Sequence, residues 1–374
     1  MRTVRLAILF LIVVSNATAA VSDCATTNSA GFCTAERPRT WVFPRDHGAH
    51  PGYQTEWWYI TGNVADASGR PFGFQFTIFR REITTSTEGR RSSWAVRDIF
   101  LAHAAVSDIE DRRFHHTEAA RRPVAGTAGA STETLKIWGG GFHLDGSNPG
   151  RPWRLGAEGK GFSYNLELSP LKPPVFHGPG GVEKKGDAPG QASYYYSIPR
   201  LATSGTVSLD GRTYMVTGEA WMDHEFGSAT LANNQAGWDW FGLQLDDGTD
   251  LMAYRMRLKD GGLDRNSAAT LIDRQGNPYW FTASEFVITP HGEWRSPHSG
   301  ALYPAAWRIE IPARGLELEV RPRAADQELS TGGTTGVTYW EGSVSVDGQS
   351  SGTAVKGLGY AELTGYAESM AGRF

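Results

Sequence analysis

Short runs of aromatic and β-branched residues, each followed by a turn containing Gly, Asp or Asn, repeat along this chain. The first two runs, at 57–64 and 72–80, are separated by a turn at 66–69. Runs with this spacing predict antiparallel hairpins, and no convincing long amphipathic helix interrupts them. With 45 glycines to form the turns, the sequence predicts an all-β fold of sandwich or barrel type.

The same pattern predicts further strands at 201–209, 213–221, 238–245, 251–258, 270–274, 279–282, 339–346 and 357–365. The segment 169–190 differs because five prolines interrupt it, and proline cannot donate to a strand ladder. We interpret this segment as a long loop over one barrel mouth, where long loops usually serve function.

The length of 374 residues indicates more than one domain, since single cores usually stop growing at roughly 250–300 residues. Residues 233–237 lie between two groups of predicted strands. We therefore expect an N-terminal barrel at 41–234 and a C-terminal barrel at 235–374, both antiparallel and packed side by side.

The first residues have the pattern of a signal peptide. Arg2 and Arg5 precede an apolar run at 6–14, and a small-residue cleavage pattern ends at Ala19. The run is shorter than the ~20 residues that a membrane-spanning helix needs, and no comparable run follows. We expect residues 1–19 to be removed, leaving a periplasmic or secreted protein without a stable membrane anchor.

The two cysteines, Cys24 and Cys33, both lie in the expected N-terminal arm at 20–40. In an oxidising compartment they are expected to form a disulfide, with two free thiols as the alternative. A metal site on this pair is poorly supported because no neighbouring His or Cys completes the ligand set.

The formal charge is −4, and loss of Arg2 and Arg5 would make it −6. This balance argues against a nucleic-acid partner, which requires clustered Lys and Arg. Basic pairs such as Arg80-Arg81 are expected at solvated strand ends. A nucleotide cofactor is not expected either, because the chain has neither a P-loop nor a dinucleotide-binding glycine motif after a strand.

The segment 54–59 contains one acid among aromatic residues. In a strand, Glu56 and Trp58 point one way while Trp57 and Tyr59 point the other. A carboxyl group desolvated beside an indole has a raised pKa and is a candidate acid. The alternative is an ion pair between Glu56 and an arginine such as Arg80.

A second segment, 218–227, ends an apolar strand with Asp223, His224 and Glu225. Alternation places Asp223 and Glu225 on one face and His224 on the other. Two carboxylates on one face repel unless one keeps its proton or a cation lies between them. No metal is predicted, because only one imidazole is local, and a buried structural network of polar groups remains the alternative.

Downstream, Trp238, Trp240 and Gln244 share a strand face that suits either a long apolar ligand or an ordinary core. The segments 339–342 and 359–366 again mix aromatic residues with acids. Taken together with 56–59, 221–227 and 238–240, these motifs resemble the carotenoid 1,2-hydratase and AttH-like family over about residues 41–366.

The resemblance implies two lipocalin-like barrels with a cleft for an apolar small molecule or lipid. In the hydratase branch, water adds to a terminal double bond of an acyclic carotenoid, without a cofactor. Other members carry signal peptides and are described as secreted hydrolases or as partners of an ABC transporter permease.

The expected reaction is acid-catalysed addition of water to an alkene. Asp223 is the predicted proton donor with Glu225 as its like-charged neighbour, Glu56 is the alternative donor, and His224 and Tyr59 position water. Aromatic faces would stabilise the cation. The expected substrate-binding residues are Trp57, Trp58, Trp221, Trp238, Trp240, Gln244, Tyr339 and Trp340. A non-catalytic carrier and an accessory protein of a transporter are the two alternatives.

Overall fold

The computed structural model describes residues 24–370 except 87–88, 90–91 and 93–94. The predicted signal peptide lies outside these residues. Helical structure in the described part of the chain is confined to three short 3-10 helices: η1 (Arg45–His47), η2 (Pro179–Gly181) and η3 (Pro312–Arg314). The all-β prediction is therefore confirmed.

The first sheet runs in the order β4-β3-β2-β1-β13-β12-β9-β8-β7-β6-β5, with β10 and β11 also paired to β12. Its strands are β1 (Thr55–Asp66), β2 (Pro71–Glu82), β3 (Asp98–Asp108), β4 (Arg113–Arg121), β5 (Ala128–Ala130), β6 (Lys136–Gly139), β7 (Phe142–Asp145), β8 (Trp153–Gly159), β9 (Phe162–Pro170), β10 (Val175–Phe176), β11 (Val182–Lys184), β12 (Ala192–Leu209) and β13 (Arg212–Gly227).

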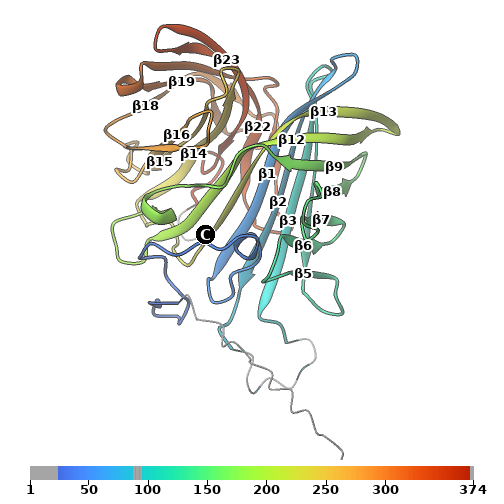
Figure 1. Ribbon diagram of the computed structural model, residues 1–374, viewed down its shortest axis with the longest axis vertical. Helices are drawn as coiled ribbons and strands as arrows, with labels where there is room; N and C mark the ends of the chain where they lie inside the picture. Colours follow the sequence, from blue (N-terminus) through green and yellow to red (C-terminus); the bar gives the residue numbers. More distant parts are fainter. Residues whose placement is uncertain (1–23, 87–88, 90–91, 93–94, 371–374) are drawn as a thin grey trace, which may run out of the picture.

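The second sheet runs in the order β17-β16-β15-β14-β23-β22-β20-β19-β18, with β21 paired to β22. Its strands are β14 (Gln235–Leu245), β15 (Asp250–Leu258), β16 (Ala268–Ile272), β17 (Pro278–Thr282), β18 (Val287–Arg295), β19 (Leu302–Ile311), β20 (Leu316–Pro322), β21 (Glu328–Ser330), β22 (Thr338–Ser350) and β23 (Thr353–Leu363). The chain passes from one sheet to the other between Gly227 and Gln235. The two sheets curl into barrels that lie side by side, the first in blue to green and the second in yellow to red (Figure 1).

The predicted hairpins form because their turn residues satisfy the backbone locally. Between β1 and β2, Asp66 Oδ1 accepts hydrogen bonds from the backbone N–H of Ser68 at 2.8 Å and of Arg70 at 3.0 Å. Gly69 closes the turn with a φ of 88°, a conformation that side chains disfavour.

Each barrel is filled by the side chains that point inward from alternate strand positions. Trp58, Phe74 and Phe76 belong to the core of the first barrel. Trp307 and Trp340 belong to the core of the second. Strand alternation then leaves the neighbouring residues on the outer faces, where the two barrels meet.

The proline-rich segment 169–190, predicted as a long loop, contains two short strands. It pairs with β12 through β10 and β11. It also reaches the second barrel, where Lys172 Nζ donates to Asp250 Oδ2 at 2.6 Å and to the carbonyl of Gly248 at 2.7 Å. The segment therefore connects the two barrels.

The disulfide between Cys24 and Cys33 is confirmed, with 5.2 Å between their Cα atoms. Cys33 packs with Tyr194 and Phe226 on the end of β12 and β13. The bridge therefore ties the N-terminal arm to the first barrel. Across the described residues, none of the helices has the length and apolar character needed to cross a membrane.

Candidate functional site

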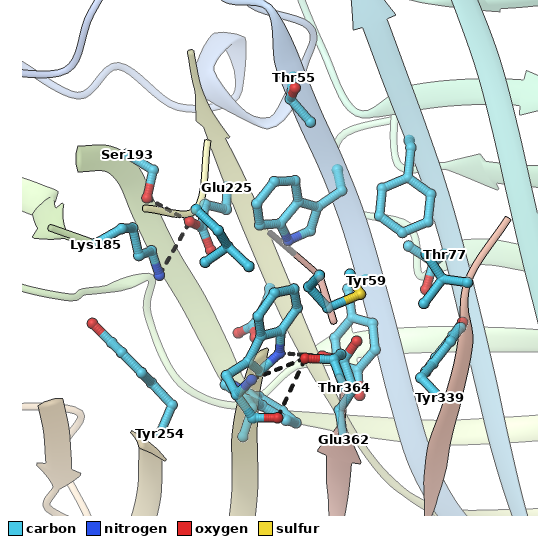
Figure 2. Close-up of a pocket in the computed structure, with 18 of the residues that line it drawn as sticks. Thr55, Tyr59, Thr77, Lys185, Ser193, Glu225, Tyr254, Tyr339, Glu362 and Thr364 are labelled. Atoms are coloured by element: carbon cyan, nitrogen blue, oxygen red, sulfur yellow. Dashed lines mark hydrogen bonds and ion pairs between the residues drawn. The ribbon is translucent and has the colours of Figure 1, made fainter. Parts of the chain in front are cut away.

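A cavity of about 160 Å³ lies between the outer faces of the two barrels. Strands β1, β2 and β13 form one wall, and β14, β22 and β23 form the other. Aromatic side chains from both sheets surround it, together with carboxyl groups and one lysine (Figure 2). The site is therefore built by the contact of two barrels and not inside either one.

The ladder register explains how distant residues share the first wall. Tyr59 on β1 lies directly opposite Asp223 on β13 and opposite Thr77 on β2. Two residues earlier, Trp57 lies opposite Glu225. Directly opposed side chains project from the same face, so both carboxyl groups reach the cavity beside aromatic rings.

The second wall is built in the same way. Trp240 on β14 lies opposite Tyr254 on β15 and opposite Glu362 on β23. Glu362 in turn lies opposite Glu341 on β22. Trp238 donates its indole N–H to Glu362 Oε2 at 3.1 Å (Figure 2). Two acids therefore face the cavity from the second barrel.

Asp223 is held by three donors. Its Oδ2 accepts from the Tyr195 hydroxyl at 2.6 Å, and its Oδ1 accepts from the Trp221 indole at 2.6 Å and from the Ser197 hydroxyl. Burial raises the pKa of Asp223 to about 7 against the opposing effect of these hydrogen bonds, and the nearby charge of Glu225 adds to the rise. The carboxyl group can therefore gain or lose a proton near neutral pH.

A buried histidine supports this arrangement from behind the wall. His177 Nε2 lies 2.6 Å from the Ser197 hydroxyl, and its Nδ1 lies 2.9 Å from the Thr270 hydroxyl. Burial holds the pKa of His177 well below its ordinary value, so the ring is neutral. The Ser197 hydroxyl donates its proton to Asp223. The Ser197 oxygen can therefore accept a hydrogen bond from the N–H at His177 Nε2. The orientation of the donors therefore favours Asp223 as a carboxylate, the form of a base.

The surroundings of Glu341 are the opposite of those of Asp223, because in the described part of the chain its carboxyl group accepts none of the hydrogen bonds that Asp223 has. Its side chain is 1 % exposed. The hydroxyls of Tyr59 and Tyr339 are its polar neighbours. Neither contact has hydrogen-bond geometry, and among the described residues both Glu341 oxygens and the Tyr59 hydroxyl lack a partner. Burial, followed by the charge of Glu362, raises the pKa of Glu341 well above its ordinary value. The surroundings of Glu341 therefore favour the protonated form of its carboxyl group.

The other two acids that line the cavity, Glu362 and Glu225, have different surroundings. Burial raises the pKa of Glu362 to about 7. Glu225 is paired with Lys185, whose Nζ lies 3.2 Å from Oε1, and it also accepts from the Ser193 hydroxyl (Figure 2). The Lys185 ammonium lies 4.6 Å from the ring centroid of Tyr254. One end of the cavity therefore carries an ion pair.

The structure brings seven of the sequence-predicted site residues to the cavity. These are Trp57, Tyr59, Asp223, Glu225, Trp238, Trp240 and Tyr339. Trp221 does not line the cavity, but its indole holds Asp223 from behind. Alternation along β13 is as expected, with Asp223 and Glu225 on the cavity side and His224 facing the barrel core.

Glu56 and His224 lie inside the first barrel, away from the cavity. Arg80 Nε donates to Glu56 Oε2 at 2.9 Å, so the ion pair with Arg80 is confirmed. His50 Nδ1 and His224 Nε2 lie 2.8 and 2.9 Å from Glu56 Oε1. The pKa of Glu56 is held well below its ordinary value because the Arg80 charge and the histidine contacts outweigh its burial. Glu56 is therefore an anion in the structure and not a proton donor.

The expectation that Arg80 is a solvated strand end is wrong, since the residue is 2 % exposed. Its guanidinium also contacts Glu82 and Asp98. The nearby ligand atoms of His50, Glu56 and His224 lie within 4.8 Å of one another, a spacing that could hold a metal ion. The Arg80 guanidinium already pairs with Glu56, so His50, Glu56, His224 and Arg80 form a hydrogen-bonded network that needs no metal ion to balance the charge of Glu56.

Three more predicted binding residues lie away from the cavity. Trp58 stacks on His224 inside the first barrel, with ring centroids 4.8 Å apart. Trp340 lies in the core of the second barrel and donates to the Ala325 carbonyl at 2.8 Å. Gln244 donates from Nε2 to the Pro199 carbonyl at 2.8 Å and so joins the two barrels.

The sequence interpretation did not assign roles to Glu341, Glu362, Lys185 or Tyr195. Glu341 and Glu362 stand in segments whose mixture of acids and aromatic residues was noted. Alternation along the strand puts Glu341 on the same face as Tyr339 and opposite to Trp340. This alternation is the sequence signal that could have identified Glu341 as a site residue. Lys185 had no comparable signal, because its position depends on how the loop at 169–190 packs. Tyr195 lies on β12, in a part of that strand that precedes the predicted strand at 201–209.

Three comparisons place the chain among known proteins. A family model described as AttH-like matches residues 34–366. The crystal structure of a protein from Nitrosomonas europaea assigned to AttH superposes with a TM-score of 0.80, at 34% identity, covering 90% of this chain and 100% of that one. The structure of kievitone hydratase from Nectria haematococca has the same fold, with a TM-score of 0.68 at 14% identity, over 90% of this chain and 98% of that one.

A curated protein, dehydratase asqC of Emericella nidulans, is 24% identical over 237 residues. The match covers 60% of this chain and 65% of that protein, so just under two thirds of the relative is spanned. The resemblance seen in the sequence motifs is confirmed by the family model and by the fold. This chain, with its two barrels and the cavity between them, belongs to the AttH-like family.

Proposed function

We propose that the cavity binds an apolar molecule carrying an alkene or an alcohol, and adds or removes water by proton transfer. One observation carries the proposal: Asp223 and Glu341, two buried carboxyl groups with opposite hydrogen-bond environments, line one aromatic-walled cavity. Environments that push two pKa values apart create an acid and a base at the same pH.

The roles follow from the contacts. Glu341 lacks donors and holds a proton, so it is the acid that protonates the alkene carbon. Asp223 accepts three hydrogen bonds, so it is the base that takes a proton from the attacking water. This assignment moves the donor role from Asp223 to Glu341. The reverse sequence of the same transfers removes water from an alcohol.

The aromatic side chains of the cavity walls suit a carbocation intermediate. Protonation of a substituted alkene leaves a carbocation, which the faces of aromatic rings stabilise. Trp57 and Trp240 line the cavity from opposite barrels, and Tyr59 packs edge-to-face on Trp240 with centroids 5.3 Å apart. Tyr59 has an unpartnered hydroxyl among the described residues and is positioned to bind the water or the substrate oxygen.

The relatives support the same class of chemistry. One relative is named a dehydratase and one structural neighbour a hydratase, and the two reactions are the forward and reverse directions of one water transfer. The residues proposed here act without a cofactor. We further propose that the protein is exported, which is supported by the signal-peptide pattern and by the disulfide.

The test starts from the purified protein expressed with its signal sequence. Organic extraction and mass spectrometry should recover an apolar molecule in two forms that differ by one water. Glu341→Gln should still yield the molecule but in one form only. An unmodified lipid that is identical in the wild type and the variant would indicate a carrier. An empty cavity would favour an accessory role with an ABC-type permease.

A further inference from the structure

Asp223 is held by two hydroxyl donors that are themselves hydrogen-bonded to further residues. These donors are Tyr195 and Ser197, and a hydroxyl can rotate to suit its partners. The Trp240 indole nitrogen lies 3.0 Å from the Tyr195 oxygen, and His177 Nε2 lies 2.6 Å from the Ser197 oxygen. Two hydrogen-bond chains therefore converge on the carboxyl group of Asp223, one on each oxygen.

The first chain begins on β14 in the second barrel. Trp240 donates its indole N–H to the Tyr195 oxygen, and Tyr195 donates to Asp223 Oδ2 at 2.6 Å. An indole nitrogen can only donate, so the Tyr195 proton cannot serve the contact with Trp240. The carboxyl oxygen of Asp223 is the acceptor within reach. Trp240 therefore directs the Tyr195 proton at Asp223.

The second chain begins at Thr270 on β16, also in the second barrel. Burial holds the pKa of His177 well below its ordinary value, so the neutral ring carries one proton. While Asp223 is a carboxylate, Ser197 donates to it, and the Ser197 oxygen requires a donor at Nε2. Nδ1 then accepts from the Thr270 hydroxyl at 2.9 Å. His177 therefore has the Nε2–H tautomer and directs the Ser197 proton at Asp223.

Both chains are buried and lie against each other. Tyr195, His177 and Thr270 are at most 2 % exposed. The backbone N–H of His177 donates to the Tyr195 carbonyl at 3.0 Å, and the centroids of the two rings are 4.2 Å apart. In a low-dielectric interior, hydrogen bonds in a chain strengthen one another by about 10–30% per bond. The outer donor of each chain therefore strengthens the bond that ends on Asp223.

We propose that Trp240 and His177 are positioning residues for the base. Trp240 acts through Tyr195, and His177 acts through Ser197. The role rests on the proposed function, in which Asp223 takes a proton from the attacking water. Because one chain starts on the second barrel and the other is anchored there, Asp223 of the first barrel reaches its working strength as a base only where the two barrels are in contact.

The first test measures the pKa of Asp223 by ¹³C NMR of the full chain, labelled at the aspartate carboxyl carbon. Asp223→Asn identifies the signal, whose pKa in the wild type should be about 7. Tyr195→Phe should raise this pKa by about one to two units, the range for loss of a hydrogen bond to a charged group. Trp240→Phe should raise it by about half a unit, the smaller effect of an outer bond. In the Tyr195→Phe background, Trp240→Phe should cause no rise beyond that from its effect on packing.

The comparison of the two backgrounds separates positioning from packing. A packing effect of the smaller ring at position 240 is common to both backgrounds and cancels. The other titratable groups around Asp223 are present in every variant, namely Glu225, Glu362, Tyr59 and, beyond Glu225, Lys185. Equal shifts in the two backgrounds would therefore overturn the role of Trp240.

Trp138→Phe on β6 is the matched control. It also removes an indole N–H, which donates to the Gly126 carbonyl at 2.9 Å outside the cavity. The pKa of Asp223 should be unchanged in this variant, and a rise as large as that from Trp240→Phe would count against the first chain.

The second test reads the tautomer of His177 in the wild-type protein by ¹⁵N NMR with labelled histidine. At about pH 8.5, where Asp223 is ionised, the signal that is lost in His177→Gln should be that of the Nε2–H tautomer. The Nδ1–H tautomer would show that Ser197 donates to His177 and not to Asp223, and would overturn the second chain. Neither measurement uses a substrate, so either chain can fail while water transfer stands, and both can hold where water transfer fails.

Discussion

Glu341 and Glu362 lie directly opposite each other on β22 and β23, and both line the cavity. Like charges at opposed positions of a ladder destabilise a sheet. The pKa of each carboxyl group is raised, to about 7 for Glu362 and well above the ordinary value for Glu341. At neutral pH the pair therefore carries at most a partial charge, and it becomes more charged as the pH rises.

Stability should consequently fall between about pH 4.5 and 7. A carboxyl group with a raised pKa binds a proton more tightly in the folded state than in the unfolded state, so ionisation favours unfolding. Replacing Glu362 with Gln should stabilise the protein at pH 8 relative to wild type by up to about 3 kcal/mol, the equivalent of a pKa of about 7 against 4.5. The difference should vanish below about pH 4.5. Urea denaturation at several pH values measures this, and a pH-independent difference would contradict the assigned pKa.

Removing either member of the acid–base pair should abolish turnover without abolishing binding. We expect Asp223→Asn and Glu341→Gln each to lower kcat about 10²- to 10⁴-fold, the range for loss of a positioned proton-transfer group. The Kd for the extracted ligand should change little, because both side chains keep their size. Asp347→Asn, at an exposed position on β22, is the control. Full activity in Asp223→Asn would exclude Asp223 as the base.

Arg80 should matter for stability and not for chemistry. Its guanidinium pairs with Glu56, Glu82 and Asp98 inside the first barrel. Replacing it with Met leaves buried carboxylates unpaired, which costs about 3–5 kcal/mol. Arg81→Met is the matched control, since Arg81 is half-buried and its guanidinium donates to the Thr55 hydroxyl, not to a carboxylate, in the described part of the chain. Chemical denaturation should show a loss below about 1 kcal/mol for the control. Similar losses for both variants would contradict the role given to Arg80.

The disulfide should stabilise the first barrel without affecting the cavity. Cys24 and Cys33 close a short loop, with a sequence separation of 9. A loop of this size contributes about 2–3 kcal/mol in the chain-entropy model. Replacing both cysteines with Ser should lower the free energy of unfolding by that amount, as measured by urea denaturation. The Kd for the extracted ligand should stay unchanged, and a loss of binding would show that the arm shapes the cavity.

The fold could be predicted from the sequence because its evidence is local. Each hairpin requires an apolar run, a turn with Gly or Asp, and a second run, and β14 with β15 shows all three. The segment 169–190 was harder to interpret, since its path depends on contacts such as Lys172 with Asp250, which are distant in sequence.

The site could be predicted only in part. Alternation separated Asp223 and Glu225 from His224 correctly, but it does not tell which face of a strand meets the other barrel. The sequence therefore predicts roles for Glu56 and Trp58 although their face is the barrel core. The sequence alone does not single out Glu341, because its importance comes from its place in a cavity wall, and that cavity forms by the contact of two barrels whose residues are distant in sequence.

The most direct test of the central claim is isotope exchange from water into the ligand. The purified protein with its extracted molecule is incubated in H₂¹⁸O, and the molecule is then analysed by mass spectrometry. Water transfer in the cavity predicts that the hydroxylated form gains the heavy oxygen with the wild-type protein, and that Asp223→Asn and Glu341→Gln abolish this gain. A ligand that remains unlabelled with the wild-type protein, while binding normally, would show that the cavity carries its ligand and does not transform it.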